Sequence, residues 1–277
     1  MAQVWLVSGS SRGLGRAIVE AGLAAGNKVL ATARDIESLR YLSERYGDQV
    51  KLFALDVTDE SAAAGAIKTA IDAFGSLDVV INNAGYGNIS SVEDTPMSDF
   101  RAQIETNLFG TIIVTKAALP YFRERKAGHF VQFSSVGGRI GPPGRGPYSA
   151  AKWAVEGFSE VLSREVAALG IKVTIVEPGG FRTDFAGSPT KLSEGHPEYD
   201  STVGATARFQ RDYNGRQPGD PKKAAQAIVQ VTREQKPPLR LLLGSDAYNA
   251  TEKNDLGRLE EARTWKTLSQ STDFESA

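Results

Sequence analysis

Short apolar runs alternate with longer helical patterns along most of the chain. The runs, which are rich in β-branched residues, lie at 3–8, 28–32, 50–55, 78–82, 129–134, 171–177 and 239–243. Between them, apolar residues recur every three or four positions at about 13–25, 36–46, 60–74, 98–125, 149–169 and 221–234. This alternation predicts βαβ units around a parallel sheet. Because most of the runs are apolar on both faces, we expect helices on both sides of that sheet.

Nothing in the sequence separates two cores. It has no internal repeat and no linker rich in proline and glycine. We therefore predict a single α/β domain over 1–277, built on a doubly wound parallel sheet of about seven strands. The segment 184–220 is rich in glycine and proline, including Pro189, and shows no sustained period. Its length and its place after the sixth strand predict a lid over a substrate site. The tail 246–277, helical around 255–268, is expected to be peripheral.

Composition narrows the possible functions. The 277 residues carry 32 basic and 33 acidic side chains, so no overall field attracts nucleic acid or an anionic membrane. The absence of cysteine excludes disulfides, thiolate metal sites and cysteine nucleophiles, and with only two histidines we expect no metal site. No apolar window reaches about 18 residues, and Met1 leads at once into the first apolar run. We expect an unprocessed cytoplasmic protein that acts on a small molecule.

A glycine cluster marks the junction of the first strand and the first helix. Glycine permits a tight turn and lets backbone amides approach a pyrophosphate, whose charge is favoured at a helix N-terminus. Three glycines alone also occur in ordinary turns, but the strand–turn–helix setting predicts a dinucleotide site. The cluster reads Ser8, Gly9, Ser10, Ser11, Arg12, Gly13, Leu14 and Gly15.

Tyr148 and Lys152 are one helical turn apart at the start of the fifth helical segment, so the phenol and the ammonium lie on one face. A free tyrosine titrates near 10, and a nearby cation favours the phenolate, so we expect Lys152 to lower the Tyr148 pKa. On its own, this spacing usually marks a solvated helix face. Ser134 and Ser135, at the end of the preceding strand, are placed to emerge beside Tyr148, where a serine hydroxyl can donate to a substrate oxygen.

Polar or glycine-rich residues also follow other predicted strands. Asp56 and Val57 follow the third strand, where Asp56 either binds a ligand or caps the next helix. The segments 82–85 (Asn-Asn-Ala-Gly) and 178–183 (Pro-Gly-Gly-Phe-Arg-Thr) follow the fourth and sixth strands, and each by itself reads as a turn. Asn107 interrupts an apolar helical pattern and either satisfies a local backbone break or holds a water.

Taken in order, these motifs resemble the short-chain dehydrogenase/reductase family. The resemblance covers Gly-x-x-x-Gly-x-Gly at 9–15, Asn-Asn-Ala-Gly at 82–85, a serine ahead of Tyr-x-x-x-Lys, and Pro-Gly-x-x-x-Thr at 178–183. It spans residues 3 to about 184, and 237–244 resembles the C-terminal strand of longer members. Ser8 replaces the usual threonine and keeps its hydroxyl. The resemblance implies a Rossmann-like fold, a nicotinamide-dependent oxidoreductase, and a homodimer or homotetramer formed through 98–125 and 149–169.

The resemblance also implies roles for individual residues. Tyr148 is the acid/base, Lys152 lowers its pKa, Ser135 rather than Ser134 orients the substrate, and Asn107 both satisfies the backbone and holds a relay water on Lys152. Asp56 accepts from the adenine amine, the backbone at Phe181 bonds the carboxamide, and Thr183 reaches that group or the pyrophosphate. The full set placed against the cofactor is Gly9, Ser11, Arg12, Gly13, Leu14, Gly15, Arg34, Asp56, Val57, Asn83, Ala84, Gly85, Tyr148, Lys152, Pro178, Gly179, Phe181 and Thr183.

The end of the second strand predicts which nicotinamide cofactor binds. Ala33 stands where NAD-preferring members carry aspartate, and Arg34 follows it. A 2′-phosphate beside Arg34 and Arg12 gains charge-assisted hydrogen bonds, whereas NAD leaves both cations unpaired, so NADP(H) is favoured. The alternative is that both are ordinary solvent-exposed arginines.

The sequence thus predicts NADP(H)-dependent interconversion of a ketone or aldehyde and an alcohol. Two alternatives stay open: a non-enzymatic NADP-binding sensor or scaffold, which is expected to have lost part of the catalytic set, and an epimerase or dehydratase on the same fold. Apolar residues expected to border the site favour a medium or bulky apolar substrate. They are Tyr86, Gly137, Gly138, Ile140, Pro142, Pro143, Phe181 and Phe185.

Overall fold

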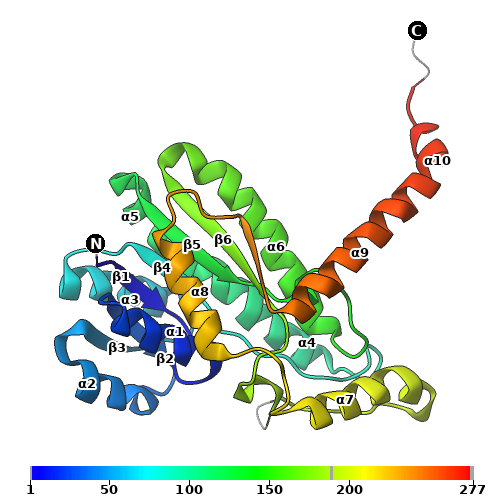
Figure 1. Ribbon diagram of the computed structural model, residues 1–277, viewed down its shortest axis with the longest axis horizontal. Helices are drawn as coiled ribbons and strands as arrows, with labels where there is room; N and C mark the ends of the chain where they lie inside the picture. Colours follow the sequence, from blue (N-terminus) through cyan, green and yellow to red (C-terminus); the bar gives the residue numbers. More distant parts are fainter. Residues whose placement is uncertain (1, 188–189, 275–277) are drawn as a thin grey trace.

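A seven-stranded parallel sheet forms the centre of the molecule (Figure 1). The computed structural model describes residues 2–187 and 190–274, so Met1, Ser188 and Pro189 of the expected lid, and the last three residues of the tail lie outside the described residues. The strand order is β3-β2-β1-β4-β5-β6-β7, which confirms the predicted doubly wound, Rossmann-like α/β fold. The strands are β1 (Val4–Val7), β2 (Lys28–Ala33), β3 (Val50–Ala54), β4 (Val79–Asn82), β5 (Gly128–Phe133), β6 (Ile171–Pro178) and β7 (Arg240–Leu243).

Helices cover both faces of the sheet because successive side chains of each buried strand point to opposite faces. In β1, Trp5 and Val7 pack with one core cluster, while Val4 and Leu6 pack with the other. The first cluster is covered by α1, α2 and α8, and the second by α3, α5 and α6. The helix bounds are α1 (Gly13–Ala24), α2 (Arg40–Tyr46), α3 (Glu60–Phe74), α4 (Met97–Ile104), α5 (Gly110–Arg125), α6 (Gly146–Val166), α7 (Ala205–Tyr213), α8 (Pro221–Arg233), α9 (Ser245–Thr264) and α10 (Lys266–Gln270).

The helical segment predicted at 98–125 is continuous but irregular. A π-helical turn, Glu105–Phe109, joins α4 to α5 and contains the buried Asn107. An inserted residue of this kind is common at functional sites because it turns one side chain inward.

The expected lid contains a helix that hydrophobic periodicity did not reveal. Helix α7 and the turns before it lie beside the loop after β4, where Ile89, Val203 and Ala207 form a small buried cluster. Ile89 also bridges to Leu192, and its amide donates to the Lys191 carbonyl. The segment is therefore attached to the molecule by both apolar and backbone contacts.

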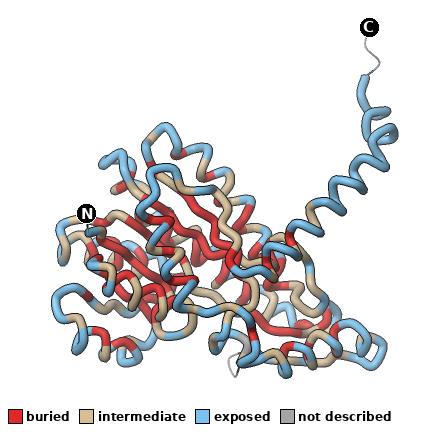
Figure 2. Tube along the Cα trace, viewed as in Figure 1, coloured by how far each residue is buried: buried red, intermediate tan, exposed pale blue. Residues whose placement is uncertain are grey.

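The C-terminal tail differs from the expected peripheral segment at its start. Helix α9 begins at Ser245, ten residues before the predicted 255, and its first turns bury Ala247 and Thr251. Farther along, α9 and α10 extend away from the body, and their surface is almost entirely exposed (Figures 1 and 2). No helix in the described ranges is long and apolar enough to cross a bilayer.

The side chain of His129 is buried in β5 and has one hydrogen-bond partner among the described residues. Its Nε2 lies 2.9 Å from the Thr174 hydroxyl, which itself donates to the Pro238 carbonyl, so Nε2 carries the proton and Nδ1 is bare. Nδ1 is buried without a partner. Burial, and secondarily the charge of Lys172 on the adjacent strand, lower the His129 pKa to about 3.

This pKa predicts a loss of stability in mild acid. The unfolded histidine titrates near 6.5, so the native state resists protonation, and its stability is complete above that pH and falls as the pH drops toward 3. We expect His129→Gln, which keeps an Nε donor, to lose about 2 kcal/mol less than the wild type between pH 7 and pH 5. Urea unfolding of both proteins at the two pH values measures the difference. Equal losses would contradict the assignment.

Candidate active site

The loops after β1 and β4 are locked together at the carboxyl edge of the sheet. The Ser8 hydroxyl accepts from the amides of Asn83 (3.0 Å) and Ala84 (3.1 Å). In return, the Asn83 side chain donates to the carbonyls of Ser8 and Gly9, at 3.1 Å each. Ser8 therefore supplies the hydroxyl that the turn needs, and the side chain of Asn83 braces the glycine cluster.

Two glycines of the cluster are required by its geometry. Gly9 has a positive φ of 69°, which disfavours any side chain. A Cβ atom on Gly15 would lie 2.2 Å from the Gly9 carbonyl oxygen, closer than any real contact. The turn at the start of α1 is therefore tight enough to require glycine at both positions, as in turns whose backbone amides approach a phosphate.

The loop after β6 meets the same turn. A Cβ on Gly13 would lie 3.6 Å from the Thr183 side chain, so the predicted Pro178–Thr183 segment reaches the glycine cluster. The Thr183 hydroxyl accepts from the Phe185 amide. Sequence reasoning missed Asp246, at the start of α9, whose carboxylate accepts from the Gly180 amide at 2.7 Å and holds this loop. The tail therefore shapes the site.

The two predicted phosphate-binding arginines lie at the surface. Arg12 and Arg34 are exposed, and within the described residues neither forms an ion pair with a carboxylate. The charge of Arg34 contributes to lowering the pKa of Asp56 and opposes the rise in the Tyr86 pKa. Arg34 therefore acts electrostatically on the loops after β3 and β4. One Asp56 oxygen accepts from the Thr58 amide and hydroxyl, which is the main cause of its lowered pKa. Asp59 caps α3, so the capping alternative for Asp56 is wrong.

Tyr148 is buried at the start of α6. Its ring is in close contact with the loop after β4, because a Cβ on Gly87 would lie 2.7 Å from it. Phe185 of the expected lid lies 5.7 Å away between ring centroids. Burial is the largest influence and raises the Tyr148 pKa, while Ser135 and Arg145 act in the opposite direction.

Lys152 lies next to the Tyr148 ring, one helical turn farther along α6. Its Nζ is 5.8 Å from the Tyr148 ring centroid and donates to the Phe133 carbonyl at 2.8 Å. Burial lowers the Lys152 pKa to about 8, and Glu156 one turn farther on opposes that effect. Lys152 is not among the groups that shift the Tyr148 pKa, which differs from the sequence expectation. The reason is the lowered pKa of Lys152 itself, about 8, which leaves the amine uncharged before the buried phenol ionises.

The two serines after β5 have different surroundings. Ser134 donates to the Lys152 backbone carbonyl, so its hydroxyl serves the packing of α6 on β5. Ser135 accepts from the Gly137 amide at 3.0 Å, and its hydroxyl and the Tyr148 ring both border Gly137, where a Cβ would lie 3.5 Å and 3.3 Å from them. This contrast supports the choice of Ser135.

Asn107 joins the π-helical turn to the loop after β4. Its side chain donates to the carbonyls of Gln103 and Tyr86, at 2.8 Å each, and accepts from the Tyr86 amide at 3.2 Å. Its oxygen also faces Gly85, where a Cβ would lie 2.4 Å from that oxygen and 3.4 Å from Lys152 Nζ. Asn107 thus satisfies the irregular backbone, as expected, and lies beside the ammonium.

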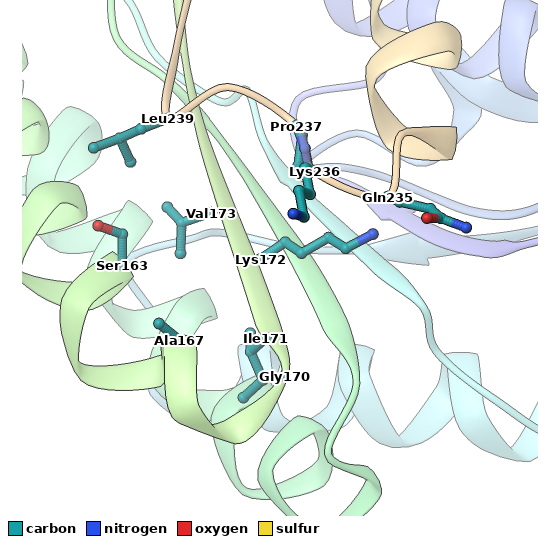
Figure 3. Close-up of a pocket in the computed structure, with 10 residues that line it drawn as sticks. All are labelled: Ser163, Ala167, Gly170, Ile171, Lys172, Val173, Gln235, Lys236, Pro237 and Leu239. Carbon is teal, nitrogen blue, oxygen red and sulfur yellow. The ribbon is translucent and has the colours of Figure 1, made fainter.

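A surface pocket at the other end of the sheet has no part in this arrangement. It lies at the amino end of β6, where α6 ends and the chain approaches β7 (Figure 3). It contains no glycine-rich turn and none of the predicted site residues. Its lining is Ser163, Ala167, Gly170, Ile171, Lys172, Val173, Gln235, Lys236, Pro237 and Leu239.

Comparison with known proteins identifies the family. Residues 3–192 match the model of the short chain dehydrogenase family, and the chain belongs to it. The chain is 48% identical over 270 residues to oxidoreductase BOA17 of Botryotinia fuckeliana, covering 97% of this chain and 98% of that protein.

Solved structures give the same result. A short-chain dehydrogenase from Streptomyces avermitilis is 41% identical and superposes with a TM-score of 0.91 over 98% of both chains. ElxO, solved with NADP bound, is 26% identical with a TM-score of 0.74, covering 90% of this chain and all of that one.

Glycine geometry gives a stability prediction. Gly15→Ala forces a methyl group against the Gly9 carbonyl, so we expect the free energy of unfolding to fall by about 2 kcal/mol or more. Gly157→Ala is the matched control, because its site in α6 has no neighbour within 4 Å and alanine is the better helix former. Denaturant unfolding compares the two. A Gly15→Ala protein as stable as the control would refute the tight turn.

Proposed function

We propose that the protein is an NADP(H)-dependent oxidoreductase of CH–OH groups that interconverts a ketone or aldehyde and an alcohol. One observation carries the proposal: Tyr148 and Lys152, two ionisable groups with perturbed pKa values, are buried together beside Ser135. They lie at the edge of the sheet where the glycine turn begins α1. Perturbed pairs of this kind are typical of proton-transfer sites.

The choice of NADP(H) rests on charge and on backbone geometry. The tight glycine turn at the start of α1 fits a pyrophosphate, and the exposed cations Arg12 and Arg34 fit a 2′-phosphate. The NADP bound to ElxO is consistent with this choice. We propose that the other cofactor-binding positions are those assigned by the family resemblance.

In the proposed reduction, Ser135 and Tyr148 hold the carbonyl oxygen with their hydroxyls. NADPH, when bound, supplies the hydride. Tyr148 gives its proton to the oxygen, and its raised pKa means that the phenol is protonated at neutral pH. Lys152, with a pKa of about 8, can exchange protons near neutrality and resupplies the phenol through a water held at Asn107. Oxidation of the alcohol follows the reverse path.

The substrate is proposed to be medium or bulky and apolar. The tilted ring of Phe185 lies 5.7 Å from that of Tyr148, and α7 packs against the loop after β4, which supports a lid role for 184–220 in a single domain. A homodimer or homotetramer is proposed through the long helices, whose exposed apolar side chains include Met97, Phe109 and Val161.

Removing the phenol hydroxyl tests the catalytic role. Tyr148→Phe deletes the proton donor, so we expect turnover to fall by about 10³-fold while NADPH affinity changes little. Tyr248→Phe, at an exposed position on α9, is the control. Steady-state assays on a carbonyl panel and fluorescence titration of NADPH give the two quantities. A Tyr148→Phe enzyme with the wild-type rate would exclude the mechanism.

Removing one cation tests cofactor preference. Arg34→Ala loses charge-assisted hydrogen bonds to the 2′-phosphate, so the ratio of kcat/KM for NADPH to that for NADH should fall about 10-fold to 100-fold. Arg40→Ala is the control because Arg40 is engaged with Glu37 at the surface. If the wild type uses NADH as well as NADPH, the assignment is wrong.

A further inference from the structure

A second cation, Arg145, lies beside the proposed catalytic phenol. It precedes Tyr148 by three residues at the start of α6, so the two side chains share one helix face. The guanidinium carbon is 5.8 Å from the centroid of the Tyr148 ring. This equals the distance from Lys152 Nζ to the same centroid, with Lys152 one turn on the other side of Tyr148.

Arg145 is half-buried, and its environment is unusual for an arginine withdrawn from water. Its Nη2 donates to the side-chain oxygen of Gln210 at 2.8 Å, and Gln210 is a neutral, buried residue of α7. Among the described residues, no carboxylate forms an ion pair with Arg145, and the one group whose charge shifts its pKa is Tyr148. Burial lowers the Arg145 pKa, which means that the charged guanidinium is less stable here than in water.

We propose that Arg145 is a positioning residue for proton transfer at Tyr148: held by Gln210 of α7, its guanidinium stabilises the phenolate that remains when the proton has left. The assignment rests on the proposed function. It gives this half-buried cation an anion to pair with at the step in which the phenolate forms.

The groups around the phenol come from several elements. Arg145 and Lys152 lie on α6 itself, Ser135 comes from the turn after β5, and the expected lid contributes the neutral ring of Phe185. Ser135 and Arg145 lower the Tyr148 pKa against the effect of burial. Lys152 Nζ lies equally close, but its pKa of about 8 is below the raised pKa of the phenol, so Arg145 is the cation that stays charged while Tyr148 ionises.

Gln210 connects this charge to the lid. It is one of the two buried residues of α7, and its contact with Arg145 joins the segment 184–220 to the start of α6. The packing of α7 against the start of α6 therefore holds the Arg145 guanidinium beside Tyr148. The helix that covers the site thus also positions the positive charge that acts on Tyr148.

Titration of the phenol in the NADP⁺-bound enzyme tests the proposal without a substrate. The near-ultraviolet absorbance of the phenolate is followed against pH, and Tyr148 is isolated by subtracting the matching Tyr148→Phe protein. We expect Arg145→Gln to raise the midpoint by about one pH unit, a tenfold change in the phenolate fraction below it. Arg145→Lys should restore most of the shift, and Gln210→Ala should move the midpoint in the same direction by less.

Arg164→Gln, at an exposed position on the same helix, is the control and should leave the midpoint unchanged. An unchanged midpoint in Arg145→Gln would overturn the proposal. If Arg145→Gln does not fold, an unchanged midpoint in Gln210→Ala would overturn it instead. A failure of the proposed function is distinguishable, because it would appear as wild-type turnover in Tyr148→Phe.

Discussion

The removal of a phenol and an ammonium from water on one face of α6 is the constraint on which the rest of the site depends. Tyr148 and Lys152 are both buried, and burial alone disfavours the charged form of each. Burying the two groups lowers the free energy of unfolding unless neighbouring residues offset the loss of hydration. The Phe133 carbonyl, Ser135 and Arg145 provide that compensation locally, and each belongs to an element that ends or begins at the carboxyl edge of the sheet.

The sheet topology explains why these groups meet. In a parallel doubly wound sheet, all strands end at the same edge, and the order reverses between β1 and β4. Ser8 after β1 is bonded to Asn83 after β4, so the glycine turn and the loop that contacts Tyr148 are held as one unit. Asp246, at the start of the C-terminal helix, holds the loop after β6 in the same way. The tail is thus a structural part of the site.

Periodicity and motif spacing predicted the seven strands, the main helices and the family, because buried strands and amphipathic helices leave regular apolar patterns. Helix α7 was missed because its buried positions are Ala207 and Gln210, while the large apolar Phe209 is exposed. The role of Arg145 depends on a contact with Gln210, 65 residues away, which no local pattern encodes. For the same reason, spacing alone could not show that the Lys152 ammonium turns toward Phe133.

A crystal structure of the NADP⁺ complex is the most direct test of the central claim. We predict that the dinucleotide crosses the carboxyl edge of the sheet, with its 2′-phosphate at Arg34 and its nicotinamide beside the Tyr148 hydroxyl. A dinucleotide bound elsewhere, or a phenol turned away from the nicotinamide, would contradict the account.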